Sequence, residues 1–406
     1  MNATLEFQDF EFIEEKDRVR VNFLKLFYFH IDKEQLSKIS EYRLDKNKII
    51  FQDISEKSAL NKFNMLVSQG FNNLKNSLND HKTIYIHQNS GIPLLGTRSF
   101  GIVDRGSQML ELKPMTSCNI NCTYCSVDEG ISTKKVVDYI VEEEYLVDET
   151  RKLVELKTKD SETKIDIYIN PHGEPLLYAD IVELIDDLKK IKGINNTHII
   201  TNGILLTEEL IDRLADAGLT HINISISSLD EKNAKILAGT AKYDINHVKK
   251  MVEYALKRLK VIITPVYVPT KNEKDIEDII EYAKPLKIPV MIQNFLENKR
   301  GRSPVKQKSW DEFFVFLEEL EKKHNISLKN VDQTEIIETK ELEVPFKRNE
   351  TVKANIIAPG RYPNESLAIA KDRSITVFDH IFEKQKTIKV RILNIKNNLI
   401  TARACE

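Results

Sequence analysis

The sequence predicts an α/β protein whose central part is a parallel sheet with helical connections. Strand-like and helix-like segments alternate over residues 109–296, and parallel strands need crossovers of this kind. The flanking segments differ: residues 1–105 mix β-like and helix-like stretches, and residues 345–406 hold short β patterns. The central sheet is either doubly wound or curled into a partial barrel. In both arrangements the loops after the strand C-termini carry the chemistry.

Residues 1–105 show the weakest pattern in the chain. Residues 19–31 alternate as a β-strand does, residues 58–78 are helix-like, and glycines at positions 91, 96 and 101 interrupt the last part of the segment. We expect an α+β N-terminal domain here and assign it no function.

The central domain is expected over residues 106–310. Its six predicted strands cover residues 109–114, 164–171, 197–203, 221–228, 260–269 and 289–296. Predicted helices between them cover residues 179–192, 207–217, 245–258 and 275–287. The second of these helices has the clearest ends, because Thr207 is a suitable N-cap and Gly218 a suitable stop.

A helix over residues 311–324 and a polar linker complete the segment 311–344. Residues 345–406 follow with β patterns at 352–359, 367–370, 374–378 and 387–395. Several short strands without a long helix predict a small β-barrel of the oligonucleotide-binding type.

Composition and charge exclude some classes of protein. Hydrophobic residues make up 41% and charged residues 30%, which is ordinary for a soluble globular protein. There is no apolar run of membrane-spanning length and no secretory signal, so we expect no membrane association and a cytoplasmic location. The net charge of −2 hides a contrast: residues 347–406 carry 12 Lys/Arg against 6 Asp/Glu, about +6, so the remainder carries about −8.

Three of the four cysteines lie within eight residues of one another, at Cys118, Cys122 and Cys125. This loop directly follows the first central strand, and clustered thiols indicate a metal rather than disulfides. Gaps of three and two residues let one loop wrap a [4Fe–4S] cluster and leave one iron open to a ligand. The alternative is a structural zinc site, which needs a fourth ligand.

The run Cys118-x₃-Cys122-x-Tyr124-Cys125 resembles the signature of the radical S-adenosylmethionine (SAM) superfamily, and the resemblance extends over about residues 106–300. It implies a partial (β/α)₆ barrel like part of a TIM barrel, a [4Fe–4S] cluster and SAM. It also implies a one-electron reductant such as a ferredoxin or flavodoxin. In this family an electron from the cluster breaks a carbon–sulfur bond, and the resulting 5′-deoxyadenosyl radical abstracts hydrogen from the substrate. Tyr124 would then lie near the adenine, or else be a core tyrosine.

The family's second signature, a Gly-Gly-Glu-Pro stretch, is matched by Gly173, Glu174 and Pro175, with His172 in place of the first glycine. The resemblance implies that Glu174 binds the amino group of SAM. The alternative is a turn without function.

Four polar residues at the ends of later strands are further candidates for contacts with SAM, and Gln293 on the sixth strand is a weaker one. Thr201 and Asn202 end the third strand in a Thr-Asn-Gly turn, and Ser225 and Ser227 share one face of the fourth. Each has a structural alternative: Asn-Gly favours turns, and serines bond to neighbouring backbone.

Residues 345–406 resemble the TRAM domain, a small β-barrel attached to several RNA-modifying enzymes. The resemblance rests on Pro345-Phe346-Lys347, on Ala358-Pro359-Gly360-Arg361 and on the strands at 374–378 and 388–392. It agrees with the local positive charge, because phosphates are bound by cations. The candidate RNA contacts are Lys347, Arg348, Arg361, Lys371, Arg373 and Arg391, with Arg300 and Arg302 from the basic run after the sixth strand. Each of these basic residues could instead be an ordinary surface residue that contacts only solvent.

These features together predict a radical SAM enzyme that modifies RNA, first of all transfer RNA, by methylation or other C–H functionalisation. The alternatives are a radical enzyme acting on a peptide or small metabolite, and a binding module whose cluster senses redox state. Cys405 is either a hydrogen donor, a transient methyl carrier or an incidental thiol. Since the motifs of the central domain all precede residue 343, we expect a chain that ends there to keep its cluster.

Overall fold

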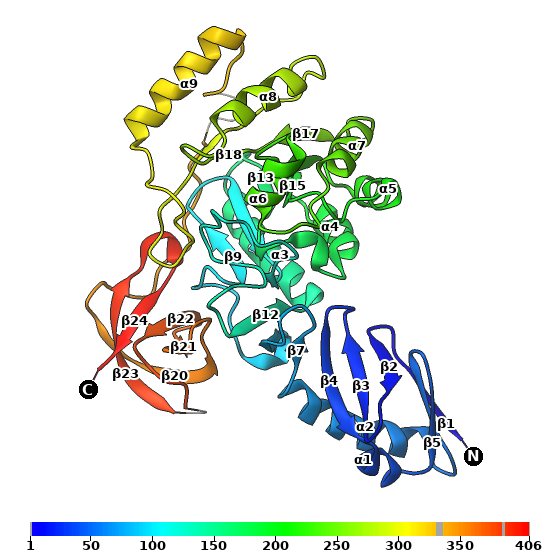
Figure 1. Ribbon diagram of the computed structural model, residues 1–406. Coiled ribbons are helices and arrows are strands. Elements are labelled where there is room, and N and C mark those ends of the chain that lie inside the picture. The colour runs from blue at the N-terminus through cyan, green and yellow to red at the C-terminus, as the bar shows by residue number, and fades with distance from the viewer. Residues whose placement is uncertain (1, 330–335, 384–385, 406) are drawn as a thin grey trace.

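The computed structural model in Figure 1 describes residues 2–329, 336–383 and 386–405. An N-terminal unit, a central half-barrel and a small C-terminal barrel follow one another along the chain, and the two termini lie at opposite sides of the molecule (Figure 1). Among the described residues no helix has both the length and the apolar character that crossing a membrane requires.

The N-terminal unit is α+β, as predicted. A three-stranded sheet has the order β1 (Ala3–Glu6), β6 (Lys48–Phe51), β5 (Tyr42–Asp45). A six-stranded sheet has the order β12 (Val137–Val141), β8 (Lys82–Ile86), β7 (Lys75–Asn76), β4 (Phe27–Asp32), β3 (Arg18–Phe23), β2 (Phe10–Glu14). Its helices are α1 (Lys33–Ser37), α2 (Glu56–Phe71) and the 3₁₀ turn η1 (Gln88–Ser90).

β12 connects this unit to the middle of the chain. It follows the cysteine loop in sequence, yet it pairs in parallel with β8 rather than with the central sheet. The predicted boundary near residue 105 stays a prediction, because the N-terminal sheet takes one strand from beyond it.

The central unit confirms the partial barrel. Its sheet has the order β17 (Lys260–Ile263), β16 (His221–Ile224), β15 (Ile194–Thr201), β13 (Ile165–Ile169), β10 (Met109–Lys113), β9 (Gly101–Asp104). The first five strands are parallel, and β9 adds an antiparallel edge. The predicted strand at 260–269 divides into β17 and β18 (Val266–Tyr267), and the sixth is reduced to β19 (Gln293–Asn294), which pairs with β18, and a bridge between Ile263 and Val290.

Helices cover one face of this sheet (Figure 1). They are α3 (Glu143–Thr158), α4 (Ile181–Lys189), α5 (Glu208–Ala217), α6 (Glu231–Ala238), α7 (Ile245–Ala255) and α8 (Glu273–Ala283), with α9 (Trp310–His324) after the last strand. The Thr207 hydroxyl caps α5 by accepting from the Leu210 amide at 3.1 Å, and Gly218 ends it with a φ of 114°. α3 and α6 were not among the predicted helices, since α3 has no side-chain cap and α6 spans two turns.

The C-terminal unit is the predicted small barrel. Five strands close it in the order β20 (Thr351–Pro359), β21 (Glu365–Ala370), β22 (Arg373–Phe378), β24 (Thr401–Ala404), β23 (Thr387–Asn394), with the turn η3 (Lys396–Asn398) before β24. It has its own apolar core around Ile356, Ile375 and Val390. β24 was not predicted, because Thr-Ala-Arg-Ala carries little β-strand signal.

Candidate active site

The cysteine loop begins on a short ribbon that joins two of the predicted motifs. β11 (Thr116–Ser117) pairs in parallel with β14 (His172–Gly173), so that Ser117 lies opposite Gly173. A Cβ atom at position 173 would overlap the carbonyl oxygen of Ser117. Glycine is therefore required where the Gly-Glu-Pro motif meets the strand that leads into Cys118.

The far side of the loop rests on the C-terminal end of α6. The amides of Asn121 and Thr123 donate to the carbonyls of Ala238 and Leu237 at 2.9 and 3.0 Å. Gly239, which ends α6 with a φ of 63°, packs so closely that a Cβ atom there would overlap the Asn121 carbonyl. Two contacts distant in sequence thus fix the course of the loop.

A cavity of about 240 Å³ lies inside this loop, at the C-terminal ends of the central strands. It brings together most of the predicted site residues. Those that line it are Cys118, Cys122, Tyr124, Cys125, Gly173, Glu174, Thr201, Asn202, Ser225 and Gln293. Pro175 lies behind them, buried in the 3₁₀ turn η2 (Pro175–Leu177) that comes after Glu174.

The three cysteines are arranged as ligands of an iron–sulfur cluster rather than as partners in a disulfide bond. All are free, and the Cys125 sulfur accepts from the Glu129 amide at 3.3 Å. Burial, and next the charges of neighbouring cysteines, raise the pKa of Cys118 well above its usual range and that of Cys122 to about 12. Thiolates in this place need compensating positive charge, which the irons of a cluster supply. The residues therefore fit the implied group.

Glu174 is held by three hydrogen bonds although its side chain is buried. One carboxylate oxygen accepts from the Thr201 hydroxyl at 2.6 Å and the Leu176 amide at 3.1 Å, and the other accepts from the Asn202 amide at 2.8 Å. Burial raises its pKa to about 7 despite these bonds. Thr201 and Asn202 thus orient this carboxylate as well as face the cavity.

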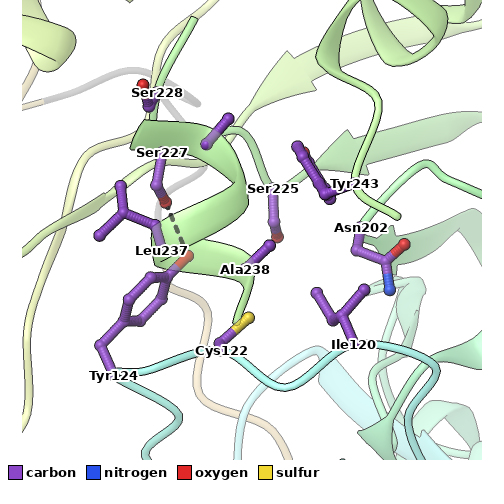
Figure 2. Close-up of a pocket in the computed structure, with 11 residues that line it drawn as sticks. Ile120, Cys122, Tyr124, Asn202, Ser225, Ser227, Ser228, Leu237, Ala238 and Tyr243 are labelled. Atoms are coloured by element: carbon purple, nitrogen blue, oxygen red, sulfur yellow. Dashed lines mark hydrogen bonds between the residues drawn. The ribbon is translucent and has the colours of Figure 1, made fainter. Parts of the chain in front are cut away.

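A smaller hollow opens beside the cavity, between the cysteine loop and α6 (Figure 2). The Tyr124 hydroxyl is 2.9 Å from the Ser227 hydroxyl, and Ser225 points toward Cys122 (Figure 2). The strand predicted over 221–228 was too long, because β16 ends at Ile224 and both serines lie after it in irregular backbone. Both side chains nevertheless line the hollow.

Sequence reasoning missed two polar residues that belong to these walls. Tyr243 closes the hollow opposite Tyr124 and comes from the segment before α7 (Figure 2). Asn294, next to the predicted Gln293, is buried against the larger cavity, and its Oδ1 atom lacks a hydrogen-bond partner among the described residues. Neither lies in a motif, so each becomes visible through the fold alone.

Residues of the C-terminal barrel contact the segment that follows the cysteine loop. Arg361, 5% exposed, donates to the Glu129 carboxylate at 2.7 Å and lies 3.6 Å from that of Asp138. The Tyr139 hydroxyl donates to the Pro359 carbonyl at 2.9 Å. The prediction that Arg361 contacts RNA is wrong on this geometry, because its guanidinium is enclosed by carboxylates.

Arg302 and Arg300 also make contacts within the protein. Arg302 donates to the Cys122 carbonyl at 2.8 Å and to the Asp128 carboxylate at 2.9 Å, so it braces the cysteine loop. Arg300 pairs with Glu365 and lies over the ring of Tyr362 at 4.5 Å. These two arginines tie loop and barrel together. Arg302, at 16% exposure, is turned away from an RNA partner, whereas Arg300, at 46%, stays a predicted RNA contact.

The other predicted RNA contacts divide into two groups. Lys347, Arg348 and Arg391 are exposed. Lys371, in the turn between β21 and β22, donates to the Pro345 carbonyl and to Glu350. Arg373, the first residue of β22, donates to Asn398 and to the Glu343 carbonyl, so both also make contacts within the protein. Cys405 directly follows β24, and its amide donates to the Lys389 carbonyl at 2.8 Å.

Comparisons with known proteins agree with this geometry. The family model described as the radical SAM superfamily matches residues 112–283. The chain is 37% identical over 362 residues to MJ0103, an uncharacterized protein of Methanocaldococcus jannaschii, with 82% of each chain covered. It is 33% identical over 213 residues to the GTP 3′,8-cyclase of Clostridium botulinum; this match covers 51% of the chain and 61% of the cyclase.

A solved structure from Streptococcus suis, SuiB, is also similar. The likeness covers 80% of the chain and 70% of SuiB, at 15% identity and a TM-score of 0.41.

Proposed function

Since this chain belongs to the radical SAM superfamily, its cofactors are a [4Fe–4S] cluster and SAM, and we propose that it uses them to modify RNA. The cluster supplies the electron that cleaves SAM. We propose that Cys118, Cys122 and Cys125 hold the cluster and that a reductant such as a ferredoxin or flavodoxin delivers the electron. A radical reaction suits the unactivated carbon atoms of a base or ribose.

The protein's own residues bind and orient the nucleotide in this proposal. Glu174 accepts from the ammonium group of SAM, because it is an anion on the cavity wall whose orientation Thr201 and Asn202 fix. The hollow with Tyr124 and Ser227 lies beside Cys122 and offers an aromatic ring and hydroxyl groups. The adenosine part itself fits the larger cavity of about 240 Å³, which Tyr124 and Ser225 also line.

Replacing Glu174 with alanine is expected to weaken SAM binding by about 2–5 kcal/mol, because a buried ammonium loses its charged partner. The cluster should remain, since Glu174 is not a thiol ligand. Equilibrium dialysis against SAM and iron analysis measure both quantities.

Because the free carboxyl of Glu174 has a pKa of about 7, the affinity of the unaltered protein for SAM should fall as the pH drops below 7. Glu174→Gln should lack this pH dependence, and unchanged affinity in either variant would argue against the assignment.

One observation on the small barrel supports RNA as the substrate. Lys353 on β20 lies directly opposite Lys389 on β23, and Arg391 on β23 lies opposite Arg403 on β24. All four side chains are exposed, and Arg403 pairs with Asp379. Like charges directly opposite each other destabilise a sheet, so a cationic face of this kind is best explained by a polyanion that covers it.

Charge reversal on this face tests the RNA proposal. Lys389→Glu/Arg391→Glu should weaken transfer RNA binding at least tenfold and flatten its salt dependence, since about two phosphate contacts are lost. The matched control is Lys235→Glu/Lys242→Glu, two exposed lysines in or just after α6. Filter binding at two salt concentrations measures both variants. If the unaltered protein, the charge-reversal variant and the control bind RNA equally, or if none binds RNA at low salt, the RNA proposal is contradicted and a small substrate is favoured.

A second candidate function has its own support. The relative from C. botulinum is named for its action on GTP, and its match covers 51% of this chain. A small nucleotide is therefore the alternative substrate, and it would need no cationic face on the barrel.

A further inference from the structure

A second polar cavity lies on the other side of the ribbon that carries Gly173. Its volume is about 300 Å³. The residues that line it are Arg98, Val103, Arg105, Glu111, Lys113, His172, Asn394, Lys396, Asn397 and Leu399. The first six come from the central unit and the last four from the turn around η3 of the small barrel, so the cavity exists only where the two units meet.

The charges on this cavity do not balance. Four cations face one carboxylate, that of Glu111, and its two oxygens are taken by Arg105 at 2.7 Å and Lys113 at 3.1 Å. In the described part of the chain neither Arg98 nor Lys396 has a carboxylate partner. The cavity therefore presents a positive charge that nothing in the described chain neutralises.

The floor of the cavity is formed by a buried lysine whose position is fixed by a hydrogen bond. Lys113, 4% exposed, donates to the Asn170 carbonyl at 2.7 Å, which fixes its amino group at the end of β10. His172 forms the wall beside it. Burial, followed by the charges of Lys113, Lys135, Arg361 and Arg98, holds the pKa of His172 well below its usual range, as expected where positive potential is concentrated.

The cavity is one strand away from the candidate active site. Asn170 and Gly173 line the cavity of the cysteine loop, whereas His172 lines the cationic one. A ligand held here would lie against the backbone that carries Glu174 and pairs with Ser117. The segment from Asn170 to Gly173 is therefore a wall that the two cavities share.

We propose that this cavity binds a phosphate group of the nucleotide substrate, through Arg98, Lys396 and the buried Lys113. Several cations converging on a cavity with few anions suit a multiply charged tetrahedral anion, which forms charge-assisted hydrogen bonds with each. The phosphate belongs either to RNA or to a free nucleotide. That the anion is a substrate phosphate rests on the proposed function.

The test uses the whole chain and inorganic pyrophosphate as the probe. The variant Arg98→Gln/Lys396→Gln removes two exposed cations that support no other contact in the described structure, so folding should be unaffected. The control is Lys57→Gln/Lys62→Gln, with the same charge change on the exposed side of α2. By titration calorimetry at constant ionic strength, the unaltered protein and the control should bind pyrophosphate alike. The cavity variant should bind at least about tenfold more weakly.

Two further titrations identify the source of the phosphate. If the cavity variant loses affinity for transfer RNA, the phosphate belongs to RNA; if it loses affinity for GTP alone, the phosphate belongs to a free nucleotide. Either result supports the site, whatever the charge reversal on β23 shows. Equal pyrophosphate affinity in the cavity variant and the control, or no binding to the unaltered protein, would overturn it.

Discussion

Replacing Cys122 with alanine is expected to remove the iron–sulfur cluster and, with it, all cleavage of SAM. The reconstituted protein should contain about four irons per chain, held by one thiolate on each of three irons. Cys122 lines both the larger cavity and the hollow beside Tyr124. Its loss removes one of three ligands from a loop whose course is fixed on both sides, so no other thiol can take its place.

Cys405→Ala is the matched control for this prediction. It removes the fourth cysteine, which comes after β24 at the end of the small barrel, and should leave iron content and the visible absorption of the cluster unchanged. Anaerobic reconstitution, iron analysis and chromatography of the SAM cleavage products measure the effect. Four irons and full cleavage in Cys122→Ala would exclude the three-cysteine site.

The sequence allowed the candidate site to be predicted where its residues are local. The cysteines lie on one loop, and Glu174 lies in a motif, so spacing and resemblance were sufficient. Thr201 and Ser225 were found because parallel strands end at a common edge. The backbone that supports them was not predicted: α6 is only eight residues long, yet carbonyls at its end accept from the amides of Asn121 and Thr123.

The position of the small barrel was beyond sequence reasoning for a physical reason. Its strands arise from local alternation, and its closure confirmed the prediction. Its docking depends on pairs such as Arg361 with Glu129, which are separated by 232 residues. A basic residue in a basic segment suggested a surface contact, whereas burial between two carboxylates is a property of the folded chain.

The contact between the small barrel and the cysteine loop also bears on the prediction that a chain ending at residue 343 keeps its cluster. Arg361 faces Glu129 and Asp138, both at most 4% exposed. Removing one partner from a buried ionic group costs about 3–5 kcal/mol, because the remaining charge stays buried without compensation. Lys135 still pairs with Glu129, and Thr116 and Asn76 still donate to Asp138, so the damage should be local.

We therefore expect Arg361→Met to lower cluster occupancy as well as thermal stability. The Glu129 amide donates to the Cys125 sulfur, so a shift of Glu129 toward water displaces a cluster ligand. Arg391→Met, which removes an exposed arginine from the same barrel, should change neither quantity. Thermal melts and iron analysis of both variants, and of a chain ending at Glu343, measure the effect. If the shortened chain reconstitutes about four irons with unaltered stability, the barrel is the detachable module that the sequence suggested. If it does not, the barrel is a structural part of the radical site.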